Sequence, residues 1–86
     1  MHSFTNTLAA IRKFFDVNCD SSKWFATAYV SWYRGGKRKV NLQDVIYLDP
    51  DRFELFTRML QLRNMPGWDD FDLYELEQYA IKLYKL

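Results

Sequence analysis

The chain has 86 residues, of which 49% are apolar, 27% charged and 19% aromatic, with 3 glycines and 2 prolines. This length holds one domain at most, and this balance excludes a disordered or low-complexity chain. The formal net charge of +1 excludes the broad positive field of a general nucleic-acid binder. Residues 1–86 are therefore expected to form a single compact domain.

A helix is predicted near the start of the chain, from Thr5 to about Val17. Leu8, Ile11 and Phe15 recur at a spacing that places them on one helical face. The segment 16–22 lacks this periodicity and is rich in Asp, Asn and Ser, so it is expected to be a loop.

The middle of the chain supports two interpretations, of which a β-hairpin is preferred. Aromatic and β-branched residues fill residues 24–34, and apolar residues alternate along residues 38–48, which favours two strands. A three-residue loop at 35–37 sets the apolar residues of the two strands opposite one another on the buried side, with Val30 facing Leu42 and Ala26 facing Ile46. We therefore predict an antiparallel hairpin over residues 24–48, in an α+β fold of helix, hairpin, helix and helix.

The alternative interpretation is all-α. Ser22 would then cap a helix that ends at Gly35, and Asn41 would cap a short helix after it. In this interpretation residues 24–64 resemble a helix-turn-helix arrangement.

Two further helices are predicted in the last part of the chain. Asp49 followed by Pro50 is a strong helix start, because the carboxylate caps the helix and proline fits its first position. After a turn over residues 64–68, Asp72 with Glu75 three residues later resembles a capping box. The core-facing row of this last helix is predicted to be Leu73, Leu76, Ala80 and Leu83.

Residue types that carry catalysis or bind metal ions are sparse. His2 is the only histidine and lies at the terminus, and Cys19 is the only cysteine. Neither a nucleophile activated by histidine nor a zinc site can be built from them on a rigid element. The glycines at 35 and 36 lack the spacing of a phosphate-binding loop. We expect a protein that is not an enzyme and takes no metal or cofactor.

The sequence also predicts the compartment. A single cysteine cannot form an intramolecular disulfide, which is typical of a reducing environment. The chain shows no signal peptide and no run of about 18 apolar residues. A cytoplasmic protein without a membrane segment is therefore expected.

Positive charge is concentrated in residues 34–39, where four of the six residues are Lys or Arg. Two aromatic residues precede them, and cations with stacking rings can grip phosphates and unpaired bases. A solvated turn or a contact with an acidic protein surface fits the same residues. The candidate contact residues are Trp32, Tyr33, Arg34, Lys37, Arg38 and Lys39.

Three tyrosines of the last predicted helix, Tyr74, Tyr79 and Tyr84, lie off its apolar row. Their rings have apolar faces and polar tips, which suit a protein interface. The plainer alternative is that they cover a small core.

Surplus aromatic residues without a catalytic constellation predict a small binding protein of the inhibitor or adaptor type, such as phages and mobile elements encode. It would occlude or bridge a larger protein partner. The alternatives are a DNA- or RNA-binding regulator that uses residues 34–39, and self-association as a homodimer.

Overall fold

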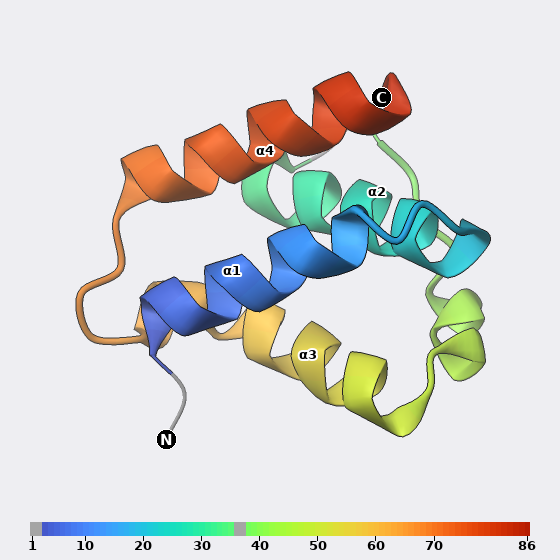
Figure 1. Ribbon diagram of the computed structural model, residues 1–86, viewed down its shortest axis with the longest axis horizontal. Coiled ribbons are helices and arrows are strands. Elements are labelled where there is room, and N and C mark those ends of the chain that lie inside the picture. The colour runs from blue at the N-terminus through green and yellow to red at the C-terminus, as the bar shows by residue number, and fades with distance from the viewer. Residues whose placement is uncertain (1–2, 36–37) are drawn as a thin grey trace.

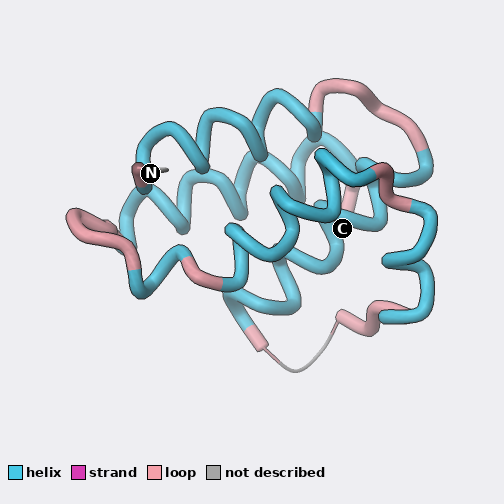
Figure 2. Tube along the Cα trace, turned by 90° about the horizontal axis from the view of Figure 1, so that it is seen from below, coloured by secondary structure: helices cyan, strands magenta, loops and turns pink. Residues whose placement is uncertain are grey.

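The computed structural model describes residues 3–35 and 38–86, and within them the only regular structure is helical. Helices, drawn cyan in Figure 2, make up most of the trace and are joined by loops. The elements are α1 (Phe4–Phe15), α2 (Asp20–Arg34), the 3₁₀ helix η1 (Leu42–Tyr47), α3 (Pro50–Leu60), the 3₁₀ helix η2 (Leu62–Asn64) and α4 (Asp70–Tyr84).

The four α-helices pack around one core. α1 and α2 contact each other, and each of them also contacts both α3 and α4. Figure 1 shows α4 along one side of the α1–α2 pair and α3 along the other, with η1 at the end of the molecule where α3 begins. None of the helices in the described part of the chain is both long and apolar enough to cross a membrane.

Aromatic side chains form the centre of the core. The rings of Phe15 in α1 and Phe25 in α2 meet edge to face, with centroids 6.3 Å apart. Phe25 packs in the same way on Phe56 of α3, at 5.8 Å. Tyr29, one turn after Phe25, donates a hydrogen bond of 2.6 Å to the carbonyl oxygen of Leu73 in α4. One aromatic cluster thus connects all four helices.

The predicted α+β fold is wrong, because residues 24–34 belong to α2 and the described residues include no strand. A strand would have placed Phe25 and Tyr29 on the face opposite Ala26 and Val30. The helical period instead gathers all four on one stripe, where each is fully buried. Burial of this stripe against α1 and α4 outweighs the local preference of aromatic and β-branched residues for strands.

The second predicted strand is also replaced. Residues 42–47 form η1, and Leu42, expected to face Val30 across the hairpin, is mostly exposed, whereas Val30 is buried. The predicted hairpin turn at 35–37 lies largely outside the described residues. Gly35 ends α2 with a φ of 80°, as the all-helical alternative expected of it.

The start of α2 differs from both interpretations. Cys19, not Ser22, is the N-cap, so α2 begins within the segment expected to be a loop. The backbone N–H of Cys19 donates to the Ser22 hydroxyl at 2.8 Å, and the backbone N–H of Ser22 donates to the Cys19 sulfur at 3.4 Å. This reciprocal capping box satisfies two amide groups at the helix start.

The other α-helices begin directly after their N-cap residues. α1 is capped by Ser3, and α3 begins at Pro50 with Asp49 as its cap, as predicted. α4 begins at Asp70, because the carboxylate of Asp69 rather than Asp72 accepts from a backbone N–H in its first turn. Of the predicted row on α4, Leu73, Leu76 and Ala80 are buried, whereas Leu83 is exposed.

Candidate protein-binding surface

The most exposed apolar residues of the described chain gather on η1. Leu42, Ile46 and Tyr47 have 67%, 68% and 73% of their surface exposed, and no residue of η1 is buried. We call these three side chains the η1 surface.

The local geometry explains why Ile46 and Tyr47 face outwards. The side chain of Asn41 accepts a hydrogen bond of 3.1 Å from the N–H of Gln43 and so starts the helix. A 3₁₀ helix has about three residues per turn, so Val45 and Leu48 share one side. Val45 packs against the core and Leu48 is buried. Ile46 and Tyr47, which lie between them in the sequence, therefore point away from the core.

η1 is attached to the helical body through Trp24 of α2. The indole N–H of Trp24 donates to the carbonyl oxygen of Asn41 at 3.0 Å. On α3, the ring of Phe56 lies 5.3 Å from the Trp24 ring. These contacts hold the base of η1 in place while its outer side chains stay exposed.

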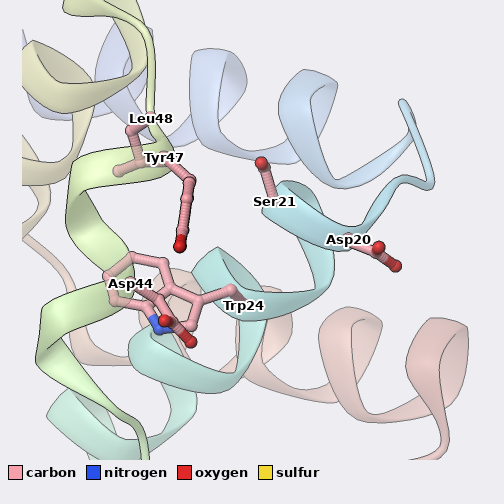
Figure 3. A pocket seen from close by; sticks show the side chains of 6 residues that line it. All are labelled: Asp20, Ser21, Trp24, Asp44, Tyr47 and Leu48. Atoms are coloured by element: carbon pink, nitrogen blue, oxygen red, sulfur yellow. The ribbon is translucent and has the colours of Figure 1, made fainter.

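Two hollows flank η1. The first, of about 260 Å³, lies between the start of α2 and η1, and we call it the Trp24 pocket. Figure 3 shows Trp24 beside Asp44 and Tyr47 from η1, whereas Asp20 points away from them. The residues that line it are Asp20, Ser21, Trp24, Asp44, Tyr47 and Leu48. The second hollow, of about 270 Å³, is lined by Trp32, Leu42 and Leu60 among others.

The aromatic residues of the predicted basic contact lie on the last turn of α2, where they are partly buried. The guanidinium of Arg63 lies 4.6 Å from the ring centre of Trp32 and 5.3 Å from that of Tyr33. The Tyr33 hydroxyl donates to a carboxylate oxygen of Asp70 at 3.2 Å. Both rings are therefore engaged within the molecule. Burial is the largest cause that raises the pKa of Tyr33, and the Asp70 carboxylate adds to it.

The basic residues of the same prediction are separated from one another. Arg34 binds Glu77 of α4. Arg38 donates to the carbonyl oxygen of Leu86 at 3.3 Å, and Lys39 is exposed. Lys37 lies outside the described residues. The structure thus brings together Trp32, Tyr33 and Arg34, but Tyr33 and Arg34 bind carboxylates of α4 and Arg63 covers Trp32.

The three tyrosines of α4 have different surroundings. Tyr74 is exposed, together with Trp68 and Phe71 near the start of the helix. Tyr79 donates to the carboxylate of Asp16, and this bond is the largest cause that raises the pKa of Tyr79. Tyr84 donates to the carbonyl oxygen of Phe15 at 2.5 Å. Two of the three tyrosines therefore tie α4 to the end of α1.

Sequence reasoning missed the η1 surface because it assigned Leu42 and Ile46 to the buried side of a strand. The signal that pointed elsewhere was Asn41, a good cap, followed shortly by the strong helix start at Asp49 and Pro50.

The described residues include no group of three or more His, Cys, Asp or Glu placed to hold a metal ion. Comparison of the chain with protein-family models, with curated proteins and with solved structures finds no match.

Proposed function

We propose that this protein is a small non-enzymatic binding protein that occludes or bridges a larger protein partner, and that the η1 surface is its main contact. The observation that carries this proposal is the exposure of Leu42, Ile46 and Tyr47 on one short helix whose base is held by Trp24.

The energetics favour burial of this surface by another protein. Covering a side chain of this size that is two-thirds exposed contributes about 1 to 2 kcal/mol. Tyrosine is among the residue types enriched at the anchors of protein interfaces, which suits Tyr47 to that role. The hollows on both sides of η1 offer places for side chains of the partner, so an occluding contact can interlock with it.

Bridging has support from a second exposed group at the other end of the molecule. Trp68, Phe71 and Tyr74 are exposed around the start of α4. Figure 1 places the loop before α4 and η1 at opposite ends of the molecule. Two partners, or two parts of one partner, can therefore be contacted at once.

The nucleic-acid alternative has less support. It needs the rings of Trp32 and Tyr33 to stack on bases, yet Arg63 lies over both of them. It also needs the Arg34 guanidinium for phosphate, and this group binds Glu77.

The test is capture of the partner from the native host with three baits: the natural protein, Ile46→Asp and Val17→Asp. Val17 is an exposed apolar residue in the loop after α1, so its substitution introduces the same charge outside η1. Each bait is first checked for helical content by circular dichroism. The captured protein is then purified, and its affinity for each bait is measured by calorimetry.

We expect the Ile46→Asp substitution to weaken binding at least tenfold and Val17→Asp to leave it within about twofold. Equal affinities for the natural protein and Ile46→Asp would remove the η1 surface from the interface. An equal loss for both variants would likewise contradict the proposal.

A further inference from the structure

We propose that the Trp24 pocket receives an arginine side chain of the protein partner. This inference rests on the proposed function, because it names the chemistry of a contact beside the η1 surface. It concerns the space between the start of α2 and η1, which the exposed side chains of η1 border but do not fill.

The volume of the pocket suits one long side chain as its ligand. Sites for small molecules usually enclose roughly 300 to 1,000 Å³. The Trp24 pocket, at about 260 Å³, lies below that range. A single long side chain from a partner that covers η1 matches it better than a free metabolite.

Aromatic rings form two of its walls. Trp24 is held in one orientation by its hydrogen bond to Asn41 and by its contact with Phe56. Tyr47 stands opposite on η1, with its hydroxyl end towards Trp24 in Figure 3. The faces of such rings attract cations, and a planar guanidinium also stacks on them.

Negative charge is supplied by Asp44, which lies beside Trp24 in the pocket. Within residues 3–35 and 38–86, no Lys or Arg of the chain pairs with Asp44 or lies over the ring of Trp24 or Tyr47. Asp20, at the start of α2, also lines the pocket, but its carboxylate points away from Trp24 in Figure 3. A carboxylate beside an aromatic ring suits a guanidinium, which can bind the acid at two points while it stacks.

An arginine of this chain already lies over an aromatic ring that is next to a carboxylate. The guanidinium of Arg12 lies 4.1 Å from the centre of the Tyr79 ring, and Tyr79 donates to the carboxylate of Asp16. Every cation placed over an aromatic ring in the described residues belongs to an arginine and none to a lysine. The Trp24 pocket also presents an aromatic ring and a carboxylate, but no described arginine of the chain lies over that ring.

The test needs no knowledge of the partner. The folded protein, labelled with ¹⁵N, is titrated with N-acetyl-arginine amide and, separately, with N-acetyl-citrulline amide, which has the same shape without the charge. The indole N–H signal of Trp24 and the backbone signals of Ser21 and Asp44 report binding. The titrations are repeated with Asp44→Asn and with the control Asp72→Asn, which removes the same charge from α4.

We expect the NMR signals of the pocket residues to shift saturably with N-acetyl-arginine amide. The affinity for N-acetyl-citrulline amide should be roughly tenfold lower than that for the arginine compound. Asp44→Asn should bring the two affinities close to each other, whereas Asp72→Asn should keep the preference for arginine. Equal binding of both compounds, no shift at these three residues, or an unchanged preference in Asp44→Asn would overturn the inference.

These outcomes are separate from those of the partner test. If the pocket shows no preference for arginine but Ile46→Asp still loses the partner, the η1 surface remains the proposed contact. The inference that the pocket binds an arginine is then wrong. If the pocket prefers arginine but Ile46→Asp binds the partner normally, the proposed function fails at η1 while the pocket keeps its chemistry.

Discussion

Arg34, the last residue of α2, forms a two-point ion pair with Glu77 in the middle of α4. Its Nε and Nη2 donate to the two carboxylate oxygens at 2.8 and 2.5 Å. The side chain of Glu77 is 1% exposed, whereas that of Arg34 is 53% exposed. A buried carboxylate is costly unless it is paired, so this contact fixes how the end of α2 lies on α4.

The ion pair predicts a change of stability in acid. The hydrogen bonds from Arg34 lower the pKa of Glu77 below its ordinary value of 4.5. A lowered pKa stabilises the fold above the unfolded pKa, and this contribution is lost as the pH falls through the folded pKa. The melting temperature should therefore fall more steeply below about pH 4.5 in the natural protein than in Glu77→Gln.

Thermal unfolding followed by circular dichroism from pH 7 to about pH 3 measures this difference. Glu75→Gln, on an exposed position of the same helix, is the matched control and should follow the curve of the natural protein. Parallel curves for Glu77→Gln and the natural protein would show that the pair contributes nothing that depends on pH.

Tyr29→Phe should destabilise the protein by about 1 to 2 kcal/mol, because it removes a buried hydrogen bond. The hydroxyl of Tyr29 donates to Leu73 at 2.6 Å, and the residue is fully buried. Urea unfolding measures the loss, and Tyr47→Phe, at an exposed position, should leave the stability unchanged. Equal stabilities of the two variants would contradict the role given to this bond.

Alkaline titration tests the same residue independently. Burial raises the pKa of Tyr29 well above its ordinary value of 10. The absorbance of ionised tyrosine should therefore lack the contribution of Tyr29 until the protein unfolds, and Tyr29→Phe should make the step at unfolding smaller by one tyrosine. Ionisation of all tyrosines in the folded state would contradict it.

The thiol of Cys19 should ionise at a lower pH in the folded protein than in the unfolded chain. It is exposed at the N-cap of α2, and the backbone N–H of Ser22 lowers its pKa from the ordinary 9.0. The rate of alkylation by iodoacetamide, measured against pH with and without urea, gives the two midpoints. Coincident midpoints would show that the cap does not stabilise the thiolate.

Replacing Lys37, Arg38 and Lys39 together by Ala should leave the free energy of unfolding within about 0.5 kcal/mol. We expect the variant to bind the purified partner more weakly and with a smaller dependence on salt, because surface charges steer association. Unchanged affinity would mean that these charges are exposed to solvent and contribute nothing to partner binding. A steep loss of affinity for nucleic acid with salt in the natural protein would favour the alternative function instead.

Several features could be read directly from the sequence because they depend on neighbours along the chain. Asp49 and Pro50 start α3, and Gly35 ends α2, since capping groups act within one helical turn. Leu73, Leu76 and Ala80 face the core because a spacing of three and four residues along a long segment is typical of one helical face. The α4 cap was misplaced because Asp69 and Asp72 are both good caps.

The middle of the chain could not be decided in that way. Between Trp24 and Arg34 the residue types favour a strand, while the spacing of Phe25, Tyr29 and Val30 also fits a helix. Only the packing of these side chains against α1 and α4 selects the helix, and that packing involves residues distant in sequence.

The candidate surface depended on tertiary structure in the same sense. The residue pattern alone indicated that the chain folds and where its first helix and its last two helices lie. It also indicated that the chain has more aromatic residues than a small core needs. It could not show that Ile46 and Tyr47 stay uncovered, because exposure depends on what already fills the space beneath them. Val45 and Leu48 take up the space against the core, so Ile46 and Tyr47 are left facing outwards.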